Sequence, residues 1–159
     1  MIIEMSDERI RPLAERYLGS TEALDAALEH HDRIVLAALD GDRLVGACFG
    51  APDESGMVIH GVAVDVDGGY ARQGIGSALL ERFESEAARR GYRHISVGSA
   101  DDERAVRFYE KHHYVISEIV TREANGVQAR RRVLEYPYSG TEGDRFLVME
   151  KTLRATGGN

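Results

Sequence analysis

The pattern of apolar and polar positions predicts a succession of short strands and helices. A strand over residues 1–5 precedes two helical patterns, and two apolar runs then meet at Asp40-Gly41, a dipeptide typical of hairpin turns. A third strand is expected from Met57 to Val66, where valines alternate with other residues. After this third strand the chain is expected to form a helix, a strand, another helix and two more strands.

The ends of two helices carry residues that commonly stand at helix termini. Ser6 is a candidate N-cap for the first helix, but Pro12 fits a start at its own position equally well. In the helix after the third strand, Arg89 and Arg90 followed by Gly91 are typical of a C-terminus.

The order of the elements predicts a single domain over residues 1–159 in the mixed α/β (α+β) class. Antiparallel hairpins come first and strand–helix–strand units come later, which favours a mixed sheet with helices on both faces. Residues 123–143 are the one long irregular region and are expected to be an insertion. Asn125-Gly126 within it is able to turn an additional hairpin.

Composition and charge narrow the class of protein. The chain has 159 residues, 43% hydrophobic and 30% charged, as in an ordinary globular protein. A net charge of -7 argues against non-specific binding to nucleic acid. No apolar run suits a membrane span or a signal peptide, so we expect neither. The single cysteine, Cys48, excludes an intrachain disulfide and favours a reducing, cytoplasmic location.

Two glycines between the third strand and the next helix are the first candidates for chemistry. The first N–H groups of a helix lack intrahelical partners, and the helix dipole favours an anion there. Gly74 and Gly76 leave space for a phosphate, and Arg72, Gln73 and Ser77 are able to add hydrogen-bond donors. The stretch lacks the third glycine of the dinucleotide fingerprint and the lysine of the P-loop. From the spacing alone, a phosphate cradle and a simple packing turn are equally open.

Three segments together resemble the GNAT superfamily of acyl-CoA-dependent N-acyltransferases. They are VAVDVDGGYARQGIGSALLERF, the later FYEKHHY and the final DRFLVMEKTL. The resemblance is close from Val62 to Val115, and the order of elements extends it over most of the chain. It implies a GNAT-like fold, in which a mixed, mostly antiparallel twisted sheet of about six to seven strands is flanked by about four helices.

The resemblance also implies which residues bind coenzyme A. The glycine motif of the family, Gln/Arg-x-x-Gly-x-Gly/Ala, cradles the pyrophosphate and is matched here by Gly74 and Gly76, with Ile75 between them. The coenzyme would dock against the loop from Arg72 to Ser77. Ala71 stands where the motif has its leading side chain, which is a departure from the family. Backbone groups of the preceding strand pair with pantetheine. This role falls on Val64 to Val66 without a gap, or on Val62 to Val64 with a two-residue insertion.

A tyrosine on the later helix is implied as the general acid. In this family the tyrosine of a Phe-Tyr pair protonates the leaving thiolate, and here Tyr109 follows Phe108. A half-buried packing role is the alternative for this residue. His113 stands where the family has a glycine. Asp102 stands where the family often has an asparagine near the coenzyme, and it also suits a helix N-cap.

The attacking amine needs a base, since a free alkylammonium has a pKa of about 10.4. Some family members carry a glutamate on the strand before the glycine loop, and His60 holds that place in ungapped register. A histidine on the polar face of a strand is the alternative interpretation, and Asp53 and Glu54 are alternative bases. A covalent route through Cys48 is disfavoured, because the sequence offers no activating partner.

The function implied is that of an N-acetyltransferase, which moves an acetyl group from acetyl-CoA to a primary amine by direct attack in a ternary complex. The alternative is a catalytically weak acyl-CoA-binding sensor or partner module of the same fold. The acceptor would be a small-molecule amine or an amine of a peptide or protein, with no nucleic acid, membrane or metal involved. Dimers are common in the family, so a homodimer is one expectation.

Overall fold

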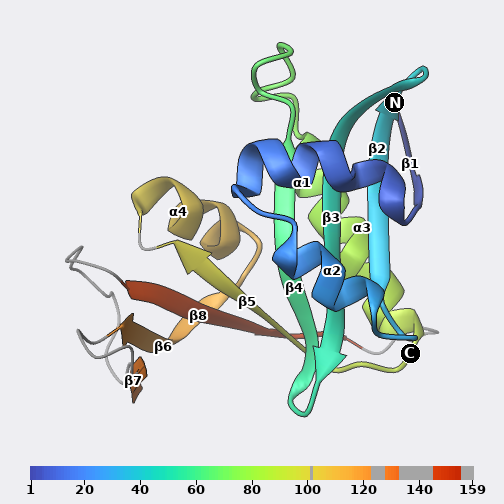
Figure 1. Ribbon diagram of the computed structural model, residues 1–159. Coiled ribbons are helices and arrows are strands. Elements are labelled where there is room, and N and C mark those ends of the chain that lie inside the picture. The colour runs from blue at the N-terminus through green and yellow to red at the C-terminus, as the bar shows by residue number, and fades with distance from the viewer. Residues whose placement is uncertain (101, 123–127, 133–144, 155–159) are drawn as a thin grey trace. The chain divides into compact units, whose positions relative to one another are not determined.

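The computed structural model describes residues 1–100, 102–122, 128–132 and 145–154. Its contacts divide the chain into two units, Met1–Ile95 with Leu153–Asn159, and Ser96–Thr152 (Figure 1). The first unit contains β1 (Ile2–Met5), a short 3-10 helix (Glu8–Ile10), α1 (Arg11–Leu18), α2 (Glu22–Leu28), β2 (Ile34–Asp40), β3 (Arg43–Asp53), β4 (Gly56–Val64), α3 (Ile75–Arg89) and the start of β5 (His94–Ala100). The second unit contains the rest of β5, α4 (Glu103–Lys111), β6 (Val115–Arg122), β7 (Gln128–Arg132) and β8 (Arg145–Thr152).

The first four strands pair in chain order, each antiparallel to the next. Two helices, α1 and α2, cover one face of these strands, and α3 covers the other (Figure 1). β2 is buried from Ile34 to Leu39, because helices lie over both of its faces, and this explains its continuous apolar run. The core under α1 and α2 consists of Ile10, Leu13, Ala14, Leu24, Ala27, Val35, Ala37, Ala47, Phe49 and Ala51.

The first α-helix begins at Arg11, with Pro12 in its first turn. Of the two predicted starts, the one marked by Pro12 is therefore confirmed to within one residue, and the one capped by Ser6 is wrong. Ser6 instead prolongs the pairing of the first two strands, since its N–H donates to the Val35 carbonyl at 2.8 Å. Proline is tolerated in the first turn because the N–H it lacks would have no helical partner there.

The C-terminus of α3 is held by a cluster of charged side chains. The helix ends, as predicted, shortly before Gly91, whose φ of 96° is left-handed. Arg90 donates through Nε to Glu86 Oε1 at 3.0 Å and through Nη1 to Asp32 Oδ1 at 2.9 Å. The Tyr92 hydroxyl also donates to Asp32, and with Arg90 it holds the pKa of that carboxyl below its usual value. The cluster ties α3 to the segment before β2.

In the second unit, β6 lies between β7 and β8 and is antiparallel to both. β7 occupies residues 128–132 of the region expected to be irregular, while residues 123–127 and 133–143 lie outside the described residues. Arg122 at the end of β6 pairs with Gln128 at the start of β7, and the predicted turn at Asn125-Gly126 lies outside the described residues. The mixed, mostly antiparallel class is confirmed. That the chain forms one domain stays a prediction.

The end of α4 explains why the family places a glycine at the position of His113. The His113 N–H donates to the Glu110 carbonyl at 2.9 Å, and the Tyr114 N–H donates to the Tyr109 carbonyl at 3.1 Å. This pair of bonds is the Schellman motif, which requires a left-handed residue after the helix. His113 has φ of 72° and is one of two residues other than glycine with positive φ among those described.

Replacing His113 by glycine is expected to stabilise the protein. His113 is exposed, so the change removes backbone strain of about 1–2 kcal/mol at a cost of about 0.5–1 kcal/mol in chain entropy. We expect the free energy of unfolding to rise by about 0.5–1 kcal/mol, measured by urea denaturation. His113→Ala, which keeps the strain, is the control, and equal stabilities of the two variants would contradict the explanation.

Candidate functional site

The loop between β4 and α3, residues 65–74, leads into an open helix N-terminus. Gly74 precedes α3 in the left-handed conformation, with φ of 77°, and no side chain caps the helix. Apart from Gly74 and its two chain neighbours, no heavy atom lies within 4 Å of the place where a Cβ on Gly74 would stand. The first N–H groups of a helix have no intrahelical partner. The loop therefore presents donors and open space, as an anion such as pyrophosphate requires.

The side chains predicted to help this loop bind a coenzyme differ in their exposure and in their hydrogen bonds. Arg72 is exposed and has φ of 60°, a left-handed conformation that is uncommon outside glycine. Gln73 is exposed, and its side-chain amide donates to the Gly69 carbonyl at 3.0 Å, so it stabilises the loop. Ile75 is buried and anchors the first turn of α3, whereas Ser77 is half-buried. Their roles toward a coenzyme stay predictions, and the backbone geometry fits such a ligand.

β4 ends earlier than the valine pattern predicts. The strand stops at Val64, which pairs with Gly46, whereas the prediction extended it to Val66 and was wrong at this end. The Asp65 N–H still donates to the Val45 carbonyl of β3 at 2.8 Å, and the Val66 N–H then bends the chain back by donating to the Val64 carbonyl at 2.8 Å. Val66 lies in the loop with 43% of its surface exposed. Of the two registers considered for pantetheine, only the one over Val62 to Val64 lies wholly within the strand.

His60 occupies a β-bulge in β4. Gly61 pairs with Phe49 and Ile59 pairs with Gly50, so His60 between them has no opposite residue on β3. Its Nδ1 lies 3.0 Å from the carbonyl oxygen of Ala23 in α2. Because a carbonyl only accepts, Nδ1 carries the hydrogen, and Nε2 of the neutral ring then carries the lone pair. The site thus orients His60 with its basic nitrogen available.

Of the alternative bases, Asp53 is poorly suited to take a proton. Burial raises the pKa of Asp53, but hydrogen bonds from Ser55 and Gly56 outweigh this and leave it below its usual value. Ser55 donates to Asp53 Oδ1 through both its N–H and its hydroxyl, each at 2.7 Å. Glu54 is exposed in the same turn.

Tyr109 lies on α4 of the second unit, and Asp102 immediately precedes this helix. Tyr109 is buried, with 8% of its surface exposed, and its ring meets those of Phe108 and Tyr114 edge-on at 5.1 and 5.7 Å. Asp102 is the N-cap of the helix, since its Oδ1 accepts from the Ala105 N–H at 2.8 Å. The capping alternative for Asp102 is therefore confirmed, and its role toward a coenzyme stays a prediction, as does the role of Tyr109.

Cys48 is fully buried in β3, as expected for a small packing residue. Burial raises the pKa of its thiol, so the reactive thiolate is disfavoured. Among the described residues, no group of three or more histidine, cysteine or acidic side chains is placed to hold a metal ion.

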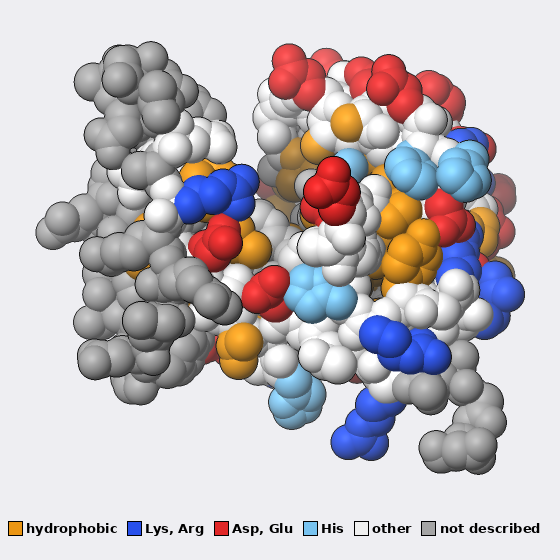
Figure 2. Space-filling view, turned by 90° about the horizontal axis from the view of Figure 1, so that it is seen from below, with side chains coloured by type: hydrophobic (Ala, Val, Ile, Leu, Met, Phe, Trp, Pro, Cys, Tyr) orange, Lys and Arg blue, Asp and Glu red, His pale blue; other side chains and the backbone are white. Residues whose placement is uncertain are grey.

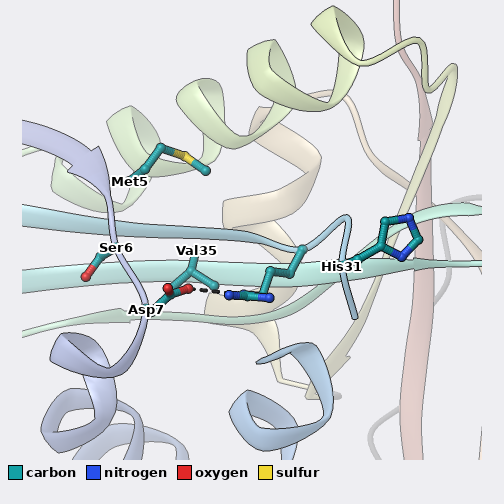
Figure 3. A pocket seen from close by; sticks show the side chains of 6 residues that line it. Met5, Ser6, Asp7, His31 and Val35 are labelled. Atoms are coloured by element: carbon teal, nitrogen blue, oxygen red, sulfur yellow. Dashed lines mark hydrogen bonds and ion pairs between the residues drawn. The ribbon is translucent and has the colours of Figure 1, made fainter. Parts of the chain in front are cut away.

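A polar cavity of about 320 Å³ lies at the end of β1 and the start of β2, and no residue predicted for the site lines it (Figure 3). Asp7 in its wall accepts from Arg33 Nε at 3.1 Å, so the two charges compensate each other. On the face seen in Figure 2, acidic side chains gather along the upper edge of the first unit, and basic side chains lie mainly at its right and lower right. The residues lining the cavity are Met5, Ser6, Asp7, His31, Arg33 and Val35.

The comparison with known families settles where the chain belongs. The model of the acetyltransferase (GNAT) family matches residues 3–114. The chain is a member of the GNAT acetyltransferase family. The resemblance carried by the glycine loop and the Phe-Tyr pair is thereby confirmed. No curated protein sequence matches this GNAT chain significantly.

Solved structures of similar fold span almost the whole chain. An aminoglycoside 6'-acetyltransferase type Ii is 25% identical, with a TM-score of 0.69 over 99% of this chain and 100% of its own. The ribosomal-protein-S18-alanine N-acetyltransferase from Escherichia coli is 18% identical, with a TM-score of 0.70 over 99% and 97%. A GNAT family acetyltransferase from Elizabethkingia anophelis with acetyl-CoA bound is 19% identical, with a TM-score of 0.73 over 96% and 97%. These likenesses confirm the GNAT-like fold.

Membrane association and location are separate questions. Within the described ranges, no helix combines the length and the apolar character needed to cross a bilayer. The cytoplasmic location stays a prediction.

Proposed function

We propose that this GNAT protein is an N-acetyltransferase that moves an acetyl group from acetyl-CoA to a primary amine in a ternary complex. The observation that carries the proposal is the open, uncapped N-terminus of α3 directly after β4, with Gly74 in a left-handed conformation. Membership of an acetyltransferase family supports the choice of ligand.

The β4–α3 loop would bind the coenzyme through its backbone. The coenzyme supplies the acetyl group as a thioester, which the amine attacks directly. The N–H groups of Ile75, Gly76 and Ser77 would hold the pyrophosphate, and Arg72 would add a positive charge. Backbone groups of Val64 and Val62 would pair with the pantetheine arm, a register that the end of β4 at Val64 supports. Alignment and backbone donors are then the main contributions of the enzyme.

Two side chains would handle protons. His60 would take a proton from the ammonium group of the acceptor at Nε2, directly or through water, while Nδ1 remains bound to the Ala23 carbonyl. Tyr109 would give its hydroxyl proton to the departing sulfur, whose thiol has a pKa of about 8.5. Removal of either group leaves alignment by the loop intact.

The acceptor belongs to one of two classes of amine. Proteins of the same fold include an aminoglycoside acetyltransferase and an acetyltransferase of a ribosomal-protein alanine. We propose a small-molecule amine or a peptide amine as acceptor, and a homodimer as the assembly to test by light scattering.

Acetyl-CoA is expected to raise the melting temperature of the protein. At 100 times the dissociation constant, the free energy of unfolding rises by about 2.7 kcal/mol. For a chain of this size, this corresponds to a shift of about 5–10 °C, measured by differential scanning fluorimetry. S-acetylpantetheine, which lacks the pyrophosphate, is the control and should give a smaller shift. No shift at millimolar acetyl-CoA would overturn both the enzyme and the sensor hypotheses.

Release of free coenzyme thiol with a panel of amines separates the two hypotheses. An amine-dependent release supports the enzyme. If the protein binds acetyl-CoA but releases no thiol with aminoglycosides, polyamines or peptide N-termini, the acyl-CoA-binding module is favoured. The missing donor side chain at Ala71 favours the same alternative.

A further inference from the structure

Asp65, the first residue after β4, is bound by groups from three different parts of the first unit. Its Oδ1 accepts from the Tyr17 hydroxyl of α1 at 2.8 Å and from the Gly68 N–H at 3.1 Å. Its Oδ2 accepts from Arg43 Nη2 of β3 at 3.0 Å. Only 14% of the Asp65 side chain is exposed. One carboxylate therefore joins a helix, a strand and the β4–α3 loop.

The contacts continue along the loop toward α3. The Tyr70 N–H donates to the Asp65 carbonyl at 3.2 Å, and the Tyr70 hydroxyl donates to Asp40 Oδ2 at 2.7 Å. The Arg43 guanidinium lies 5.2 Å from the centre of the Tyr70 ring. Gly68 has no room for a Cβ, which would stand 2.3 Å from Asp65 Oδ2 and from Arg43 Nη2. Residues 65–70 are thus fixed by bonds to the side chain and the carbonyl of Asp65 and to the side chain of Asp40.

We propose that Asp65 is a positioning residue that holds the β4–α3 loop in the conformation that binds the coenzyme pyrophosphate. The inference rests on the proposed function. A loop that is ordered before the ligand arrives pays less conformational entropy on binding. Residues 65–70 are fixed to α1 and β3. The four residues from Ala71 to Gly74, which lead into α3, therefore start from a fixed position. Tyr17 and Arg43 also hold the pKa of Asp65 below its usual value, so the carboxylate is charged near neutral pH.

The sign of the effect distinguishes positioning from simple electrostatics. Removal of a negative charge near an anion site should strengthen coenzyme binding if charge alone matters. Removal of Asp65 should weaken binding if the loop loses its order. Asp67 provides a matched control in the same loop, since its side chain is 58% exposed and its carboxylate pairs with Arg16, whose side chain is exposed as well.

The experiment compares Asp65→Ala and Asp65→Asn with Asp67→Ala. We expect Asp65→Ala to raise the KM and the dissociation constant for acetyl-CoA by about 10-fold to about 100-fold, with kcat within about twofold. Turnover of S-acetylpantetheine, which lacks the pyrophosphate, should be unchanged. Asp65→Asn keeps an oxygen that accepts from Tyr17 and Gly68, so it should lose less affinity for acetyl-CoA. This variant also tests the proposal if Asp65→Ala folds poorly. Asp67→Ala should bind acetyl-CoA as tightly as the wild type or more tightly.

Hydrogen exchange of residues 65–74 provides a readout without coenzyme. Exchange should quicken in Asp65→Ala and not in Asp67→Ala. Unchanged or tighter acetyl-CoA binding in both Asp65 variants, or an equal loss with S-acetylpantetheine, would overturn the positioning role while the proposed function stands. Failure of the wild type to bind acetyl-CoA would overturn both.

Discussion

Replacement of Tyr109 by phenylalanine is expected to lower turnover with acetyl-CoA by about 100-fold. The change removes one hydroxyl and keeps the ring that packs against Phe108 and Tyr114, so α4 should remain in place. If that hydroxyl protonates the leaving sulfur, kcat falls while the dissociation constant of acetyl-CoA does not change. Steady-state release of thiol gives kcat, and isothermal titration gives the affinity.

A second tyrosine supplies the control for this experiment. Tyr92 donates its hydroxyl to Asp32 in the charged cluster at the end of α3. Tyr92→Phe removes the same atom there, so it should lower the melting temperature without altering kcat at a temperature well below it. Turnover of Tyr109→Phe within about threefold of the wild type would mean that the general acid is another group.

Replacement of Gly50 by alanine is expected to destabilise the protein by about 3 kcal/mol. A Cβ at this position of β3 would stand 1.9 Å from the carbonyl oxygen of Val58 on β4. A backbone oxygen cannot rotate away as a side chain does, so the two strands must separate locally. The separation falls at the bulge that carries His60, and turnover should therefore fall together with stability. Thermal unfolding followed by circular dichroism measures the first effect, and we expect a fall of about 6–12 °C.

Gly98→Ala is the matched control, because it makes the same substitution in β5 with ordinary contacts of 3.6 and 3.7 Å to Phe146. Its free energy of unfolding should lie within about 1 kcal/mol of the wild type. Equal effects of the two substitutions would show that the close approach of Gly50 to the Val58 carbonyl is not the cause of the destabilisation.

The order of the elements is readable from the sequence because burial follows local apolar patterns. β2 is an unbroken apolar run, and Gly74 stands between a strand and a helix, with Gly76 in the first turn of that helix. For β7 the sequence offers only the possible hairpin at Asn125-Gly126, because Gln128–Arg132 has no apolar alternation, and the place of the strand comes from pairing with β6. The end of β4 is missed because bonds within the loop turn the chain while the valine pattern continues, from the Val66 N–H to the Val64 carbonyl and from the Gly68 N–H to Asp65.

The arrangement of the site depends on contacts between distant residues. Ala23 lies 37 residues before His60, and its carbonyl gives no signal in a sequence, although it sets the tautomer of the ring. Tyr17 lies 48 residues before Asp65, and only the packing of α1 brings them together. The bulge at His60 is a property of two strands in register, so neither strand alone predicts it.

Cys48 has a practical consequence for every assay of this protein. It is the one cysteine of the chain and has no exposed surface, so a thiol reagent added to the native protein reports the coenzyme sulfhydryl without a protein background. When substrate is left out, the same reagent reaches Cys48 only when β3 opens. Its slow labelling then measures the rate or equilibrium of that opening. One colorimetric reagent thus measures both the velocity of the enzyme and the opening of the sheet.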